Sequence, residues 1–218
     1  AAAVDVKRGM NVLDCCAAPG GKTAYMAERM EGTGRVYAWD LHSHRVELIR
    51  AMTRRLRLEN VRMAARDAAQ FREELADSMD AVLLDAPCSG LGVMDDKPDV
   101  KYRPTAESVA ALCDTQKKLL DTCCRYVKVG GTLVYSTCSM LKDENERQIA
   151  RFLASRVEKG GQTGRYGFFG VMGPDEFHMM VNNNAYTNYM GERTLRYAAD
   201  ALHELRAREP EAYEALCE

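Results

Sequence analysis

The sequence predicts an α/β fold with a mostly parallel, doubly wound β-sheet. Short apolar runs alternate with longer segments of helical periodicity as far as about residue 158, which is typical of parallel strands joined by helices that cover both faces of the sheet. The apolar runs end on chemically reactive residues, namely Asp14, Asp40, Asp67, Asp85 and Cys138. Ligands of such sheets bind beyond the carboxyl ends of the strands, so we expect a functional site there.

Five segments are predicted to be strands because each is a short apolar run; they lie at 11–16, 35–40, 61–67, 80–85 and 131–138. Helical spacing is found at 23–31, 43–58, 105–127 and 143–157. The third helix carries one stripe of residues behind Pro104, at Val109, Leu112, Gln116, Leu119, Leu120, Cys123 and Val127. Such a stripe predicts a helix that is buried on one side.

Past residue 159 the alternation weakens. The glycine-rich stretch 160–170 predicts a loop that leads into a late strand at 168–172, and 194–216 has helical spacing. We therefore expect one α/β domain over 1–175 and a helical C-terminal extension over 176–218.

The 218 residues, 46% of them hydrophobic, suit one domain with a sizeable core. No run approaches the roughly 18 apolar residues of a membrane span, so no membrane partner is expected. The cysteines lie at 15, 16, 88, 113, 123, 124, 138 and 217. They form no C-x-x-C pair, and the four histidines are scattered, so no metal site is expected. Adjacent cysteines also argue against disulfides, which favours a reducing, intracellular compartment and leaves cytoplasm, nucleolus and mitochondrion open.

The stretch DCCAAPGGKT, residues 14–23, is predicted to join the first strand to the first helix. Its small residues let the backbone approach a ligand, but the Walker spacing fails because residue 16 is not glycine. Asp40 follows Gly20 by 20 residues, the distance typical of an acid that binds ribose hydroxyls, and Asp67 is placed to accept from an adenine amino group. These residues fit an adenosine-containing cofactor without phosphates, which points to S-adenosylmethionine; a tight turn with no ligand is the alternative.

The segments CAAPGGKT, DAPCSGLG and TLVYSTCS, in this order, resemble the Sun-type (NSUN, Fmu-like) family of RNA cytosine-C5 methyltransferases over about residues 11–153. The resemblance implies a Rossmann-like class I core, S-adenosylmethionine as methyl donor and 5-methylcytosine in RNA as product. It assigns the cofactor to Cys16, Ala17, Ala18, Pro19, Gly20, Gly21, Lys22, Asp40, Asp67 and Asp85. It assigns the catalytic roles to Cys138 as nucleophile, to Cys88 in product release and to Asp85 near the target base.

The chemistry explains why a thiol is needed. Cytosine C5 is a poor nucleophile, so a thiolate first adds at C6. A group at N3 then stabilises the adduct, and Asp85 is the candidate if its carboxyl shares a proton, which burial would favour. DNA cytosine-C5 methyltransferases use a Pro-Cys dipeptide instead, which Pro87-Cys88 also offers. Spacing does not choose between the cysteines; the TCS segment, absent from those DNA enzymes, favours Cys138.

RNA is the expected partner, with ribosomal RNA favoured and tRNA second. The family's N-terminal RNA-binding region is not visible before Asn11, so sequence outside this chain, a partner protein or a ribosomal precursor particle is expected to supply RNA contacts. Six arginines, at 50, 54, 55, 57, 62 and 66, form a basic cluster. A solvated helix face is the favoured interpretation of this cluster, with phosphate contacts second. An assembly factor whose catalysis is dispensable is the alternative function.

Overall fold

The computed structural model describes residues 1–156, 158–159, 166–167 and 206–207. The chain divides into two compact units, Ala1–Asn145 and Glu146–Glu218. The predicted late strand at 168–172 and nearly all of the predicted C-terminal extension lie outside the described residues. The first unit holds all of the predicted site residues.

The first unit is built on a parallel sheet in the order β3-β2-β1-β4-β5. Its strands are β1 (Asn11–Asp14), β2 (Arg35–Asp40), β3 (Val61–Ala65), β4 (Met79–Asp85) and β5 (Val127–Ser136). The chain runs outward from β1 to β3 and then returns to β4 on the other side of β1, so the strand order reverses between β1 and β4. The predicted parallel, doubly wound sheet is confirmed.

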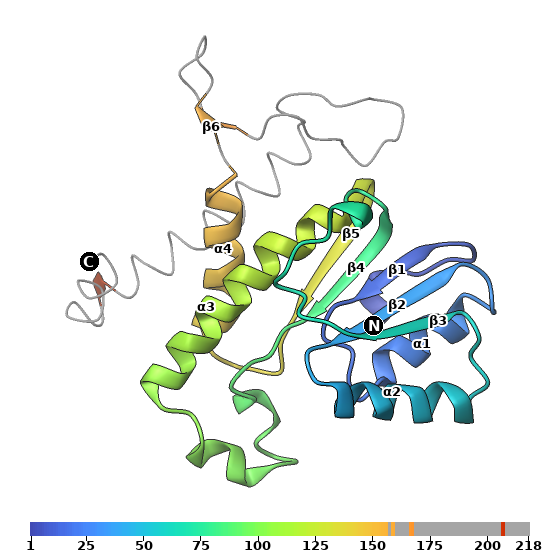
Figure 1. Cartoon of the computed structure of the whole chain (residues 1–218). Helices are drawn as coiled ribbons and strands as arrows, with labels where there is room; N and C mark the ends of the chain where they lie inside the picture. The colour runs from blue at the N-terminus through green and yellow to red at the C-terminus, as the bar shows by residue number, and fades with distance from the viewer. Residues whose placement is uncertain (157, 160–165, 168–205, 208–218) are drawn as a thin grey trace. The chain divides into compact units, whose positions relative to one another are not determined.

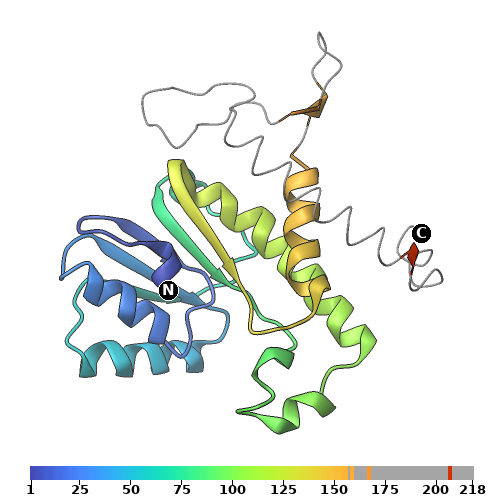
Figure 2. The ribbon, with the colours of Figure 1, turned by 180° about the vertical axis from the view of Figure 1, so that it is seen from behind.

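Helices cover both faces of this sheet. They are α1 (Gly21–Arg29), α2 (Ser43–Arg55) and α3 (Ala106–Cys123). α1 and α2 lie on one face and α3 lies on the other, as Figures 1 and 2 show from opposite sides. Short 3-10 turns occur at Ala2–Val4, Glu73–Leu75, Leu91–Val93, Pro98–Tyr102, Cys124–Tyr126 and Lys142–Glu144. The second unit contains α4 (Glu146–Ala154) and a short antiparallel pair, β6 (Glu158–Lys159) and β7 (Tyr166–Gly167).

The largest error in the predicted boundaries is at the end of α3. The expected helix 105–127 ends at Cys123, and β5 begins at Val127 rather than at 131. A tight turn over Cys124–Tyr126 makes this possible, and Gly130, at φ +78°, lets the strand continue past an irregular register with β4. At its other end β5 stops at Ser136, so Cys138 lies two residues beyond the strand rather than at its end.

Other predicted ends also differ by a few residues. β1 ends at Asp14 and β3 at Ala65, so Cys16 and Asp67 lie in turns that follow the strands. The predicted helix 143–157 begins only at Glu146, because Asn145 has a non-helical backbone (φ −121°, ψ −98°). Cys16, Asp67 and Cys138 therefore lie on loops, whereas Asp14, Asp40 and Asp85 are the last residues of their strands.

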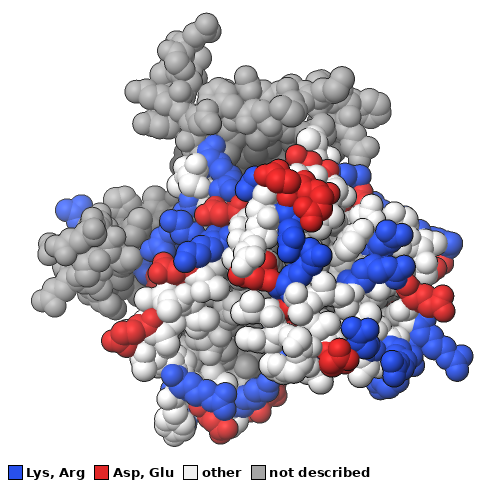
Figure 3. All heavy atoms as spheres, viewed as in Figure 1, with Lys and Arg blue, Asp and Glu red and all other residues white. Residues whose placement is uncertain are grey.

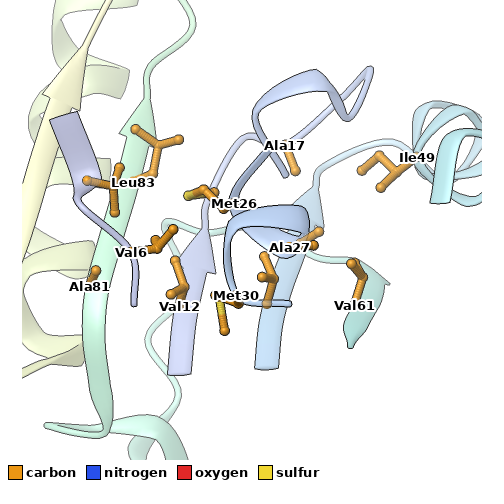
Figure 4. Packing of buried hydrophobic residues seen from close by; sticks show 13 residues of the cluster. Val6, Val12, Ala17, Met26, Ala27, Met30, Ile49, Val61, Ala81 and Leu83 are labelled. Carbon is orange, nitrogen blue, oxygen red and sulfur yellow. The ribbon is translucent and has the colours of Figure 1, made fainter. Parts of the chain in front are cut away.

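The core beneath α1 and α2 fixes the first loop in place. Met26 and Ala27 of α1 and Met30, which follows the helix, are fully buried and belong to one cluster with Val12 of β1 and Ile49 of α2 (Figure 4). Burying side chains of this size contributes about 1.5–3 kcal/mol each relative to exposure. This packing holds α1 in place, and with it the loop between β1 and α1.

Candidate active site

The loop after β1 is attached by its backbone to both neighbouring strands. The Cys15 amide donates to the Leu83 carbonyl at 2.9 Å, and the Ala17 amide donates to the Trp39 carbonyl at 2.8 Å. The loop then turns at Gly20, whose φ of +110° is left-handed and favours glycine. At Gly21 an added Cβ would meet no atom within 4 Å. The backbone therefore faces open space where the predicted cofactor would approach.

Asp14, at the end of β1, lies buried below this loop. Its Oδ2 accepts from Thr23 Oγ1 at 2.7 Å, whereas Oδ1 has no hydrogen-bond partner among the described residues. Burial raises the pKa of Asp14 to about 6, although the Thr23 hydrogen bond acts in the opposite direction. Asp14 is therefore a group whose charge changes close to neutral pH.

Asp40, predicted to bind ribose, is already engaged with the protein. Its exposed fraction is 2%. Oδ2 accepts from the Ala18 amide at 3.3 Å and lies 3.5 Å from Arg45 Nη1, while Oδ1 accepts from the His42 amide at 3.2 Å. Asp40 thus holds the cofactor loop, and a ribose hydroxyl would have to share or displace one of these partners.

Asp67, predicted to bind adenine, lies in the turn after β3. Its Oδ1 accepts from the Ala69 amide at 2.9 Å and its Oδ2 from Gln70 Nε2 at 3.4 Å. The Arg66 amide donates to the Asp40 carbonyl at 2.9 Å. Asp67 and Asp40 therefore belong to neighbouring strand ends, as predicted.

Asp85 forms an ion pair with Lys22, in the first turn of α1. Lys22 Nζ lies 2.6 Å from Asp85 Oδ2, and Ser136 Oγ donates to Asp85 Oδ1 at 2.7 Å. The hydrogen bond to Asp85 raises the pKa of Lys22 above its ordinary value. The Asp85 side chain is 29% exposed, so the deep burial that was expected to favour a shared proton is not observed. Sequence reasoning missed this pairing because 63 residues separate the partners.

The two cysteines lie side by side. The Sγ atoms of Cys88 and Cys138 are 3.1 Å apart, and the Cys138 amide lies 3.2 Å from Cys88 Sγ. Both are free thiols; Cys138 is exposed and Cys88 is partly buried. Burial, together with the hydrogen bond that the Cys88 thiol shares with the Cys138 side chain, raises the pKa of Cys88 to about 11. The prediction that both strand ends bring their cysteines together is confirmed.

The Cys16 thiol, in the loop after β1, is half-buried, and burial raises its pKa well above the ordinary value. It therefore stays protonated, in keeping with a lining residue rather than a nucleophile. Over the described part of the chain, no group of three or more His, Cys, Asp or Glu residues is arranged to hold a metal ion, and no helix there is long and apolar enough to cross a membrane.

Glu144 is a second residue that sequence reasoning missed. It lies in the charged run KDENER, residues 142–147, which indicates an exposed segment, yet its side chain is fully buried. Its carboxylate accepts from Ser89, next to Cys88. The one sequence feature that could have pointed to Glu144 is its closeness to the predicted nucleophile, since it follows Cys138 by six residues.

This fold and site define the class of Rossmann-like S-adenosylmethionine-dependent methyltransferases. The family model described as 16S rRNA methyltransferase RsmB/F matches residues 1–165, and the chain belongs to this family. The Sun-type resemblance is thereby confirmed. A second model, the glycosyl hydrolase family 65 central catalytic domain, matches residues 140–216.

Individual relatives agree with the family. The probable ribosomal RNA small subunit methyltransferase B of Bacillus subtilis (strain 168) is 44% identical over 154 residues, which are 70% of this chain and 34% of that protein. The chain thus spans about a third of the length of the curated relatives it matches.

Two solved structures from Pyrococcus horikoshii are also similar. A methyltransferase homolog protein has 32% identity and a TM-score of 0.62 over 82% of this chain and 55% of that chain. NSun6, crystallised with SFG, an analogue of S-adenosylmethionine, has 29% identity and a TM-score of 0.61 over 77% of this chain and 43% of that chain.

Proposed function

We propose that this chain methylates C5 of a cytosine in RNA, with small-subunit ribosomal RNA as the substrate and tRNA as the second candidate. The observation that carries the proposal is the pair of thiols, 3.1 Å apart, in the loops that follow β4 and β5. A methyltransferase that acts on a nucleophilic oxygen or nitrogen needs no thiol, whereas C5 of cytosine must first be activated by covalent addition at C6.

In this reaction Cys138 is the nucleophile because its thiol is exposed. Its thiolate forms the S–C6 bond, and the electron pair displaced from the C5–C6 double bond makes C5 nucleophilic. After methyl transfer, water takes the C5 proton, the S–C6 bond breaks and the double bond returns. Cys88 holds its proton at neutral pH, since its pKa is raised to about 11. It donates that proton to the departing Cys138 sulfur and regains one from water, to which Cys138 gave its own thiol proton before the attack.

Lys22 and Asp85 stabilise the adduct at N3. The Lys22 ammonium donates to Asp85 at 2.6 Å, and this hydrogen bond raises the pKa of Lys22, so the pair holds its proton on the amine, from which N3 can receive a hydrogen bond. Ser136 fixes the other carboxylate oxygen. Removing either charge would leave its partner without an ion pair beside the reacting base.

The cofactor loop and the aspartates that follow β2 and β3 would hold S-adenosylmethionine. When bound, that cofactor supplies a methyl group on a sulfonium centre. Ala18 and Gly21 let the backbone approach it, Asp40 orders the loop through the Ala18 amide, and Asp67 offers carboxylate oxygens at the neighbouring strand end.

Bisulfite sequencing tests the product. Unmodified small-subunit ribosomal RNA incubated with the chain and S-adenosylmethionine should acquire a cytosine that resists deamination, and Cys138→Ala should leave every cytosine sensitive. Methyl incorporation into this RNA without any resistant cytosine would show that another atom is methylated.

A further inference from the structure

Glu144 joins the two loops that carry the cysteines. Its Oε1 accepts from the Ser89 amide at 2.8 Å, and its Oε2 accepts from Ser89 Oγ at 2.5 Å. Ser89 Oγ also lies 3.0 Å from Ser139 Oγ. Ser89 follows Cys88 and Ser139 follows Cys138, so one carboxylate connects the residues adjacent to both thiols.

Further hydrogen bonds fix Glu144, one at its carboxylate from α3 and one at its backbone carbonyl from β5. Gln116 Nε2 donates to Glu144 Oε1 at 3.1 Å and to the Pro87 carbonyl at 3.0 Å. The Tyr135 hydroxyl donates to the Glu144 carbonyl at 2.6 Å. The residues on both sides of Cys88 are therefore tied to the segment that follows Cys138.

The carboxylate is charged although its side chain is fully buried. Burial alone would raise the pKa of Glu144, but the hydrogen bonds from Ser139, Ser89 and Gln116 outweigh it and hold the pKa below its ordinary value. These donors are electrically neutral. Burying a charge that only neutral donors compensate is costly for the fold, and removing the carboxylate would leave those donors unsatisfied.

We propose that Glu144 is a positioning residue that holds the Cys88 loop against the Cys138 loop and so keeps the two thiols in contact. Its catalytic consequence rests on the proposed function, because the contact matters when Cys88 protonates the departing Cys138 sulfur. Glu144 itself touches neither thiol directly and acts through Ser89 and Ser139.

The contact can be measured without any methylation. Dibromobimane bridges two neighbouring thiols, and peptide mass spectrometry separates a Cys88–Cys138 bridge from reactions at other cysteines. In Glu144→Ala the rate of bridging should fall by about tenfold or more, and in Ser89→Ala, which loses only the hydroxyl links, by a smaller factor. Glu144→Gln keeps an acceptor for the Ser89 amide and should bridge within about twofold of the wild type. Glu146→Ala, which removes an exposed carboxylate nearby, is the matched control and should also bridge like the wild type.

Steady-state kinetics on small-subunit ribosomal RNA complete the test. The value of kcat should follow the same order as the bridging rate, with a loss on the order of a hundredfold in Glu144→Ala, while the KM for S-adenosylmethionine stays unchanged and Glu144→Gln restores kcat. Thermal melting identifies variants that fail to fold. If Glu144→Ala does not fold, the Ser89→Ala variant carries the test in its place.

Wild-type bridging and kcat in a folded Glu144→Ala or Ser89→Ala variant would overturn the proposal. A wild-type chain that forms the bridge but methylates no cytosine, even when a small-subunit precursor particle is supplied, would refute the proposed function and leave the positioning role of Glu144 intact.

Discussion

At the scale of single residues, the environments of Cys88 and Cys138 differ in the way their proposed roles require. Cys138 is exposed, so a base in RNA can reach its sulfur. Cys88 is partly buried and its raised pKa, about 11, keeps it protonated at neutral pH. A protonated thiol is a weak nucleophile but a suitable proton donor to a leaving thiolate. This asymmetry favours the Sun-type assignment over the Pro-Cys assignment of the DNA enzymes.

Asp14 should make the stability of the chain depend on pH. Its pKa rises from an ordinary 3.8 to about 6 on folding, so the folded state binds this proton more tightly than the unfolded state. The stabilisation is fully present below about pH 4 and is lost as the pH rises through 6, a change of about 3 kcal/mol. Urea denaturation from pH 4 to 7 measures it. Asp14→Asn should lack this component of the pH dependence; identical pH profiles for the two proteins would contradict the assignment.

Asp40 should affect cofactor binding through the loop that it orders. Asp40→Ala leaves the Ala18 and His42 amides and Arg45 without their acceptor, so S-adenosylmethionine should bind more weakly by about 1–3 kcal/mol. Isothermal calorimetry measures this change, with Glu47→Ala on the exposed face of α2 as the control. An unchanged affinity would remove Asp40 from the cofactor site.

At the scale of elements, the cofactor loop is a short connection that the strands hold on both sides. Its amides are bonded to Leu83 of β4 and Trp39 of β2, and its last residue, Gly20, packs against α2. An added Cβ at Gly20 would lie 3.2 Å from the Ile49 Cα atom. The loop is therefore formed before any ligand binds.

Gly20→Ala and Gly21→Ala separate folding from binding in this loop. Gly20→Ala should lower the free energy of unfolding by about 1–3 kcal/mol, because alanine is strained at φ +110° and crowds the α2 backbone. Gly21→Ala should leave it unchanged or raise it by about 0.5–1 kcal/mol, since Gly21 begins a helix and its Cβ would meet nothing. Gly21→Ala should nevertheless weaken S-adenosylmethionine binding. Equal destabilisation by both substitutions, measured by chemical denaturation, would contradict this account of the loop.

The periodic elements were predictable from the sequence, and their junctions were not. The five strands and the buried stripe of α3 at Gln116, Leu119 and Leu120 follow from local patterns. The end of α3 was misplaced because Val127 continues the helical spacing, while its pairing with Met79 of β4 is a long-range choice. The residues predicted at strand ends do lie close together, because the carboxyl ends of parallel strands meet at the same edge of the sheet. The partners Lys22–Asp85 and Glu144–Ser89 depend on tertiary packing that no local pattern reports.

At the scale of the whole molecule, the face of the described residues seen in Figure 3 has no continuous basic patch for RNA. Lys and Arg side chains are interspersed with Asp and Glu over the face in Figure 3. Several members of the arginine cluster have protein partners: Arg50 pairs with Glu47, Arg62 donates to the Glu59 carbonyl, and Arg66 lies over the Trp39 ring. The matched relatives are about three times as long as the region they share with this chain. These facts support the proposal that RNA contacts come largely from elsewhere.

The chain alone should therefore bind naked RNA weakly. We expect a shallow salt dependence of binding, since few phosphates are neutralised, and a marked increase in methylation when a partner protein or a small-subunit precursor particle is supplied. Fluorescence anisotropy with a short ribosomal RNA fragment, repeated at several salt concentrations, measures the binding. Tight, sequence-selective binding by the chain alone would argue against a partner.

The division of labour between the two cysteines is the central claim, and a denaturing gel of protein incubated with RNA and S-adenosylmethionine tests it most directly. In Cys88→Ala, Cys138 still attacks C6 and the methyl group is transferred, but the departing sulfur lacks its proton donor, so a covalent protein–RNA band should accumulate. Cys138→Ala and the double variant should show neither the band nor methylation. A band in Cys138→Ala that is absent from Cys88→Ala would reverse the two roles and make Cys88 the nucleophile.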